Sequence, residues 1–169
     1  VRTEIARERV LLALPEHHPA IAHAYQVGNE PYPHLDVRYL DRETFIVPVT
    51  GQSMRMTANL IFQQARIRPG RLIEIGHFDV IMSMVNIGLG IGFNRLGYIH
   101  DMQKFEHVRY FFVDHEAYRS SLELIRRKGH VISNCERDFL DILVKTIQSR
   151  YGMEAVGKYK DTTDTENGQ

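Results

Sequence analysis

The sequence predicts a single domain of the α/β class with a largely parallel sheet. Its 169 residues match the usual length of one domain. Short apolar runs typical of strands alternate along it with stretches that have helical periodicity, which is the pattern of an α/β fold. Hydrophobic residues make up 43% and charged residues 25%, as in ordinary globular proteins with a buried core.

The first elements are two strands separated by a connecting segment. Residues 10–14 form a short apolar run and predict a buried strand. Residues 15–35 contain four prolines together with Gly28 and Asn29, which favours a connection with one helical turn near residues 21–24. Residues 45–49 predict the second strand, and Pro48 should lie at its end or at an edge because proline has no amide to donate.

The middle of the chain continues the alternation. Residues 52–65 predict a helix, since its apolar side chains fall on one face: Met54, Ala58, Ile61, Phe62 and Ala65. Residues 71–75 alternate like a strand, and residues 79–87 are apolar nearly all round, which predicts a short helix packed on several sides. Gly88 is placed to end that helix in a left-handed conformation, and residues 91–93 predict another strand.

The last part predicts two strands and a helix. The strands are residues 108–113 and 122–125, joined by the polar residues 114–120. Ser133 followed three residues later by Glu136 is typical of a capping box at a helix start. The predicted apolar face of that helix consists of Phe139, Leu140, Leu143, Val144 and Ile147.

Composition excludes several classes of protein. Lys plus Arg and Asp plus Glu each number 21, so the chain lacks the basic surplus of a self-contained nucleic-acid binder. A single cysteine, Cys135, rules out an internal disulfide framework and indicates a cytoplasmic location. No apolar run is long enough to span a membrane, and the acidic start with no Met indicates a piece of a longer protein without a signal peptide.

No complete catalytic signature is present. No His pair stands four residues apart on a predicted helix with a Glu between, so no zinc-hydrolase motif exists. The glycine-rich residues 88–92 close a helix and open a strand, whereas a dinucleotide-binding motif follows a strand and opens a helix. We therefore expect no enzyme activity, no catalytic residues, no metal site and no cofactor.

The most informative local feature lies between the second strand and the first long helix. The first amides of a helix have no internal partner, so Gly51 with the hydroxyls of Thr50 and Ser53 forms a candidate site for a carboxylate, sulfate or phosphate. Simple N-capping by Thr50 or Ser53 is the equally weighted alternative. His77 opens the next helix, again directly after a strand, and the two helix starts would border one cleft. Taken alone, His77 is better interpreted as a capping or turn residue.

In order and spacing, the chain resembles the effector-binding domain of LysR-type transcriptional regulators over about residues 4–148. The matching segments are ERVLLALPEHHP at 8–19, FIVPVTGQS at 45–53, VNIGLGIG at 85–92 and FLDIL at 139–143. Within the second segment, the Thr-Gly-x-Ser motif at residues 50–53 is similar to the motif of the family branch that includes the sulfur-assimilation regulators. The family commonly has a small hydroxyl residue where His77 stands, and an apolar–Pro pair where Asn94 and Arg95 stand.

The resemblance implies a two-lobed fold of the periplasmic-binding-protein type II, with the second lobe complete and the first partial. The domain would cover residues 1–152, with the second lobe at about 36–128 and first-lobe remnants at 1–20 and 133–150. Residues 153–169 would be a disordered polar tail. A partial first lobe should leave residues 10–14 as an unpaired strand edge and promote self-association.

The resemblance also implies a function. A small, anionic effector would bind in the cleft between lobes and control DNA binding by an upstream winged helix-turn-helix, which this chain lacks, in a homo-oligomer without membrane contact. The effector-binding residues implied are Thr50, Gly51, Gln52, Ser53, His77, Phe78 and Asn94. The alternative is a solute-binding protein of a transporter, which uses the same fold.

Overall fold

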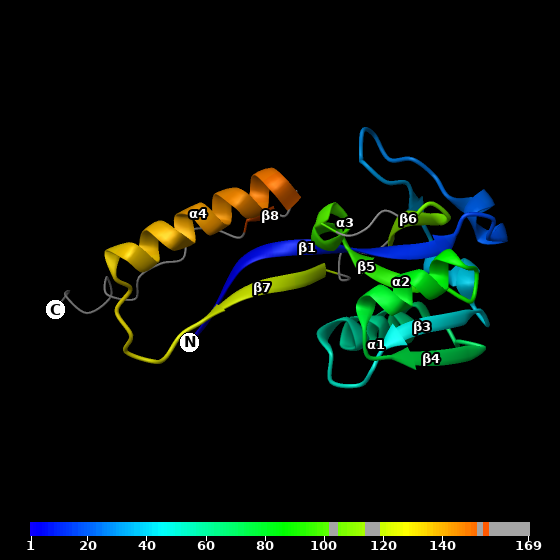
Figure 1. Cartoon of the computed structure of the whole chain (residues 1–169), viewed down its shortest axis with the longest axis horizontal. Helices are drawn as coiled ribbons and strands as arrows, with labels where there is room; N and C mark the ends of the chain where they lie inside the picture. Colours follow the sequence, from blue (N-terminus) through cyan, green and yellow to red (C-terminus); the bar gives the residue numbers. More distant parts are fainter. Residues whose placement is uncertain (102–104, 114–118, 152–153, 156–169) are drawn as a thin grey trace. The chain divides into compact units, whose positions relative to one another are not determined.

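The computed structural model describes residues 1–101, 105–113, 119–151 and 154–155. These residues fall into two compact units, a larger one of Arg9–Arg119 and a smaller one of Val1–Glu8 with Ser120–Gln169. The assignment of residues 36–128 to a complete second lobe stays a prediction. Figure 1 shows the elements, which in chain order are β1 (Arg2–Pro15), η1 (Pro19–His23), β2 (His34–Leu35), η2 (Val37–Leu40), β3 (Thr44–Pro48), α1 (Ser53–Ala65), β4 (Arg71–Ile75), α2 (Phe78–Asn86), β5 (Gly92–Arg95), α3 (Leu96–Asp101), β6 (Val108–Val113), β7 (Arg119–Ile125), α4 (Asn134–Tyr151) and β8 (Glu154–Ala155).

The main sheet of the larger unit has the order β2-β6-β1-β5. β1 runs antiparallel to both neighbours, with Leu12 opposite Phe93 of β5 and opposite Phe111 of β6. The prediction of a largely parallel sheet is wrong here, because an apolar run reports burial on both faces and not the direction of its neighbours. The expected unpaired edge at residues 10–14 is also wrong, since strands flank this segment on both sides.

Parallel pairing does occur in the second sheet. β3 and β4 lie side by side and parallel over their whole length. Ile91 extends this arrangement on the other side of β3, because Ile46 N–H donates to its carbonyl at 2.8 Å and its own N–H donates to Thr44 O at 2.9 Å. Pro48 stands at the end of β3, as predicted from its missing amide.

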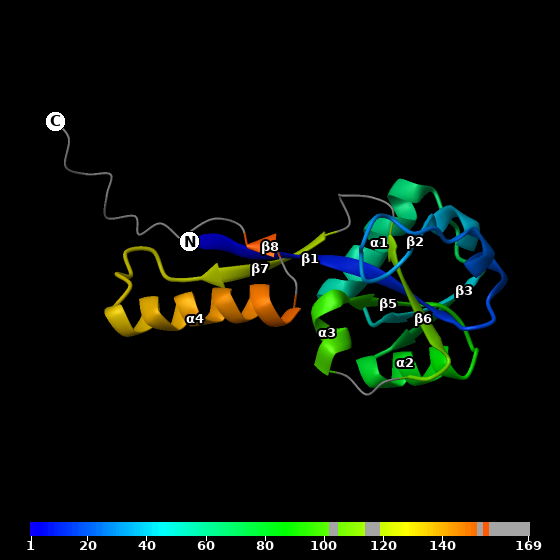
Figure 2. The same cartoon turned by 90° about the horizontal axis from the view of Figure 1, so that it is seen from above.

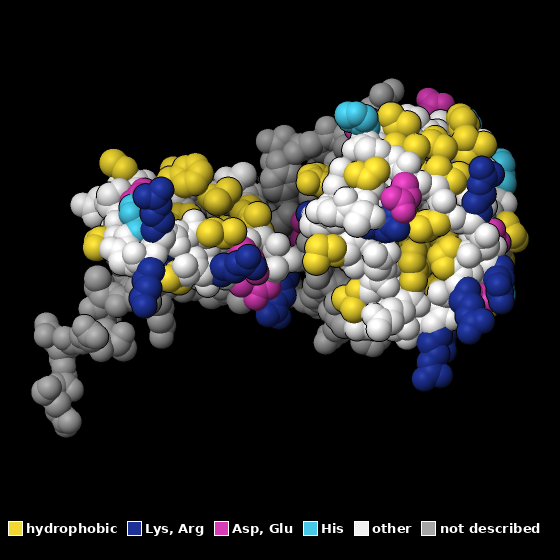
Figure 3. All heavy atoms as spheres, turned by 90° about the horizontal axis from the view of Figure 1, so that it is seen from below, with side chains coloured by type: hydrophobic (Ala, Val, Ile, Leu, Met, Phe, Trp, Pro, Cys, Tyr) yellow, Lys and Arg dark blue, Asp and Glu magenta, His cyan; other side chains and the backbone are white. Residues whose placement is uncertain are grey.

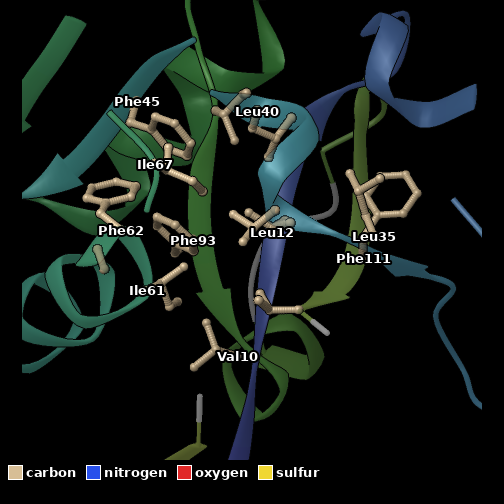
Figure 4. Close-up of a cluster of buried hydrophobic side chains, with 14 of the residues drawn as sticks. Val10, Leu12, Leu35, Leu40, Phe45, Ile61, Phe62, Ile67, Phe93 and Phe111 are labelled. Atoms are coloured by element: carbon tan, nitrogen blue, oxygen red, sulfur yellow. The ribbon is translucent and has the colours of Figure 1, made fainter. Parts of the chain in front are cut away.

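Helices α1 and α2 cover opposite faces of β3, which explains its continuous apolar sequence. Phe45 and Val47 belong to the core that includes the buried face of α1, whereas Ile46 packs with α2. Side chains alternate between faces along a strand, so a strand covered on both sides must be apolar throughout. Figure 4 shows Phe45, Phe62 and Phe93 grouped in the first core, with the ring centroids of Phe45 and Phe62 4.8 Å apart.

Most of the predicted elements are confirmed, with local differences. The 3-10 helix η1 forms at the expected helical turn, and Gly88 has φ +82° after α2. The short elements β2, η2, α3 and β8 have no counterpart among the predictions. Because Glu154 and Ala155 form β8 and pair with β1, the disordered tail predicted from residue 153 begins too early. The prediction that residues 79–87 pack on several sides is wrong: Val80 in α2 is 44% exposed, and Ile87, which follows α2 directly, is 70% exposed.

The smaller unit joins residues 2–8 of β1 to β7, β8 and α4. β8 pairs antiparallel with β1 at Ala6 and Arg7, and Figure 2 shows α4 running alongside β7. Ile5 and Ala6 pack against Ile147 of α4. The predicted apolar face of α4 is right for Leu140 and Ile147, which are buried, and wrong for Phe139, which is exposed. Residues 114–118 of the predicted polar connection and residues 156–169 of the predicted tail lie outside the described residues.

Candidate functional site

The N-termini of α1 and α2 lie beside each other in the larger unit. Gln52 is the N-cap of α1 and His77 is the N-cap of α2, and neither side chain caps its own helix. Instead, Gln52 Nε2 donates to the carbonyl of Gly76 at 3.2 Å and ties the two helix starts together. The alternative that Thr50 or Ser53 is a simple N-cap is therefore wrong, because Gln52 occupies the N-cap position of α1.

The turn that precedes α1 is held by an ion pair. Gly51 has φ +96°, a conformation that favours glycine. Arg55 pairs with Glu74 at 2.8 Å and donates to the carbonyl of Pro48 at 3.1 Å. The hydrogen bond from Arg55 lowers the pKa of the Glu74 carboxyl against the opposing effect of burial, and the Arg55 charge and the Thr50 amide lower it further. The Thr50 amide is thus already used by a carboxylate of the chain itself.

A pocket of about 310 Å³ opens next to these helix starts. We call it the Ser53–Arg95 pocket; it is lined by Pro48, Gln52, Ser53, Met54, Phe78, Asp79, Arg95 and Tyr98. Its volume is at the small end of the range for ligand pockets, roughly 300–1,000 Å³. Apolar walls with a few polar groups are the usual composition of a small-molecule site.

Arg95 supplies the positive charge of this pocket. Its Nη2 donates to Ser53 Oγ at 2.7 Å, so the Ser53 hydroxyl keeps its own proton to donate elsewhere. Arg95 Nε is buried and has no acceptor among the described residues. The guanidinium carbon lies 5.8 Å from the ring centroid of Tyr98, and that ring lies 5.8 Å from the ring of Phe78. A cation, a hydroxyl and two aromatic rings therefore face one small volume.

The structure brings three of the seven predicted residues into the lining: Gln52, Ser53 and Phe78. Thr50, Gly51 and His77 are exposed in the turns beside the pocket and are not among its lining residues. The binding roles of all these residues stay predictions.

Asn94 lies in the core and not in the pocket lining. It is fully buried, and its Nδ2 lies 3.8 Å from Met82 Sδ. Burial raises the pKa of Tyr110, and a hydrogen bond with Asn94 opposes that rise. Neighbouring residues of a strand point to opposite faces, which sends Asn94 inward and leaves Arg95 to line the pocket.

Sequence reasoning missed three lining residues that carry polar chemistry: Asp79, Arg95 and Tyr98. Arg95 had a signal, because it stands next to the singled-out Asn94 and strand alternation separates the two. Asp79 follows the predicted Phe78 directly in the first turn of α2. No sequence signal pointed to Tyr98, since the helix α3 that holds it was not predicted.

A second cavity, of about 410 Å³, lies in the smaller unit between the end of β7 and the start of α4. Of its lining residues, Glu136 contacts His130 Nε2 at 2.9 Å and also accepts from the Ser133 N–H at 2.8 Å. None of the seven predicted residues lines it.

The described residues contain neither a cluster of metal-binding side chains nor a helix that could span a membrane. Within the part of the chain that the structure describes, no three His, Cys, Asp or Glu side chains gather where they can hold a metal ion. None of the helices in that same part has the length and apolarity needed to cross a bilayer.

Comparison with family models gives one match, the LysR substrate binding domain, over residues 1–148. A comparison with curated protein sequences gives no match.

Solved structures show the same fold at low sequence identity. The regulatory domain of MetR, a LysR family regulator from N. meningitidis, has a TM-score of 0.70 at 13% identity, covering 93% of this chain and 71% of that one. The Synechocystis PCC6803 CcmR regulatory domain in complex with 2-PG has a TM-score of 0.68 at 16% sequence identity, and the match covers 88% of this chain and 67% of that one. The BenM effector-binding domain with benzoate has a TM-score of 0.66 at 14% sequence identity, and the match covers 89% of this chain and 65% of that one. Against full-length BenM, the chain spans about half of the length, 49%.

Proposed function

The chain belongs to the LysR substrate binding domain family, and from this membership we propose that it senses a small anionic effector in the Ser53–Arg95 pocket. One observation supports an anionic ligand above all: the Arg95 guanidinium lies beside the Ser53 hydroxyl, with Nη2 2.7 Å from Oγ. Charge-assisted hydrogen bonds from an arginine to a carboxylate or phosphate are the stronger hydrogen bonds in proteins.

The surroundings of Arg95 support an anion here. The starts of α1 and α2 add the positive ends of two helix dipoles, and Gln52 holds these starts together. The buried Arg95 Nε has no acceptor among the described residues, and a buried donor without a partner is costly. An anion beside Ser53 lies next to the positive charge of the Arg95 guanidinium, which favours binding of a negatively charged group.

Ligands of the structural neighbours agree with this class. Solved complexes of the same fold hold benzoate in BenM and shikimate in QuiR, both small carboxylates. These proteins are only 14% identical to the chain, so they suggest a class of compound and not a specific effector. Thr50, Gly51 and His77 remain part of the proposal as residues in the turns beside the pocket, and Asn94 remains part of it as the buried neighbour of Arg95.

The mechanism we infer is ligand-linked control of transcription. An effector that binds one arrangement of the domain more tightly shifts the population toward it. Full-length BenM is about twice as long as the matched region. We propose that this chain works within a homo-oligomeric regulator whose upstream winged helix-turn-helix contacts DNA.

The test is ligand binding by the full chain and its Ser53→Ala variant. Benzoate, shikimate and inorganic phosphate are titrated by thermal shift and then by calorimetry. We expect at least one of these anions to bind, and Ser53→Ala to weaken it roughly tenfold, the equivalent of one hydrogen bond. Ser149→Ala makes the same chemical change outside the pocket and serves as the control. Equal affinity in the two variants, or no anion binding, contradicts the proposal.

A further inference from the structure

The Ser53–Arg95 pocket contains an acidic side chain as well as a basic one. Among its lining residues Arg95 is the one cation and Asp79 the one anion, and the others are neutral. We propose that the pocket takes a zwitterion of the α-amino acid type, with its carboxylate toward Arg95 and Ser53 and its ammonium group toward Asp79. This inference rests on the proposed function: it keeps the carboxylate of the proposed ligand and adds an ammonium group.

The basic end is built to receive a carboxylate. Arg95 presents its Nε and Nη2 along one edge of the guanidinium, which is the geometry that binds the two oxygens of a carboxylate. Nη2 already donates to Ser53 Oγ at 2.7 Å, while Nε has no acceptor among the described residues. A carboxylate beside Ser53 accepts the Ser53 hydroxyl proton and lies against the positive charge of Arg95.

The acidic end is available to a donor. Ser83 Oγ donates to the backbone carbonyl of Asp79 at 2.8 Å, so this bond does not use the Asp79 carboxylate. Within the described residues the Asp79 carboxylate forms no ion pair, and in particular none with Arg95. The two opposite charges therefore border one volume without neutralising each other. A plain carboxylate ligand would satisfy Arg95 and be repelled by Asp79, whereas a zwitterion complements both charges.

The remaining walls define the body of the ligand. Pro48, Met54, Phe78 and Tyr98 are apolar or aromatic over most of their surface. The rings of Phe78 and Tyr98 lie 5.8 Å apart at an angle of 53°. With a volume of about 310 Å³, the pocket suits a small molecule with an apolar or aromatic side group. Phenylalanine and leucine are suitable probes of this class.

The experiment compares matched compounds on the full chain. One set is phenylalanine, 3-phenylpropanoate and 2-phenylethylamine, which share one body and differ in charge; leucine, 4-methylpentanoate and 3-methylbutylamine form the aliphatic set. We expect the amino acid of at least one set to bind at least tenfold more tightly than its two relatives. If the deaminated carboxylate binds as tightly as the amino acid, the zwitterion inference is overturned while the anion site stands. If no compound of either set binds, the inference is also overturned.

Two variants assign the ends of the ligand. Asp79→Asn should weaken binding of the amino acid about tenfold and leave the deaminated carboxylate unchanged or tighter. Arg95→Gln should weaken both. Asp138→Asn on α4 changes the net charge equally outside the pocket and should alter neither affinity. An Asp79→Asn variant that keeps the preference for the amino acid overturns the assignment.

Discussion

Single glycines show how closely the larger unit is packed around the segment of residues 88–92. A Cβ on Gly90 would lie 2.8 Å from the backbone oxygen of Thr44 and 3.1 Å from the Ile46 side chain. A Cβ on Gly92 would lie 2.9 Å from Met82 Cε. The glycines therefore permit close approach of this segment to β3 and α2, which agrees with the interpretation of the segment as a helix-to-strand turn.

Substitution at Gly90 should destabilise the larger unit. Gly90→Ala forces the Thr44 backbone of β3 to move, and overpacking of this kind costs about 1–3 kcal/mol. Gly76→Ala is the matched control, because its Cβ meets nothing within 4 Å and its φ is not left-handed. Urea denaturation of the two variants measures the difference in the free energy of unfolding. Equal midpoints for the two variants would show that the close approach has no energetic consequence.

At the scale of elements, the start of α4 is the clearest case of local sequence fixing local structure. Glu136 accepts from the Ser133 N–H at 2.8 Å, and the Ser133 hydroxyl in turn accepts from the Glu136 N–H at 3.3 Å. These bonds lower the pKa of Glu136 to about 2, chiefly through the Ser133 backbone amide, then the Ser133 hydroxyl and His130. The predicted capping box is confirmed.

This capping box should make α4 sensitive to acid. Because the pKa of Glu136 is lower in the folded chain, its contribution to stability is present above the ordinary value of 4.5 and is lost as the pH falls through about 2. We expect the Glu136 carboxyl carbon, followed by NMR, to titrate with a midpoint near 2. Ser133→Ala should move that midpoint toward 4.5, and Ser149→Ala should leave it in place. A wild-type midpoint near 4.5 would refute the capping geometry.

The two units of the whole molecule differ in how much apolar surface they bury. The larger unit has an extensive aromatic and aliphatic core, whereas the core of the smaller unit centres on Ile5, Ala6 and Ile147. In the smaller unit Ile125 is 69%, Phe139 63% and Ile142 64% exposed. Figure 3 shows apolar side chains at the surface of both units on the face it presents. Apolar side chains that gather at a surface promote association.

We therefore expect the isolated polypeptide to self-associate through the smaller unit. The double variant Phe139→Lys with Ile142→Lys should lower the mass measured by light scattering after size-exclusion chromatography. The control places the same charges at Thr146 and Gln148, which are exposed polar positions of the same helix. A wild-type chain that is monomeric at high concentration would contradict this expectation.

Much of the fold and part of the candidate site can be predicted from the sequence, because the signals involved are local. Period and capping act within one or two turns, so the apolar face of α1, the strand at residues 45–49 and the cap at Ser133 follow from neighbouring residues. The same local signal, a strand end followed by a helix start, singled out Ser53, which lines the pocket.

What the sequence by itself determined is therefore the order of strands and helices, the family and the place of the helix starts that border the pocket. Tertiary structure alone decided that β1 runs antiparallel to its neighbours and that Arg95 faces Ser53, 42 residues away, while Asn94 is buried. The physical reason is that hydrophobic periodicity records whether a side chain is buried and not which distant strand or side chain covers it.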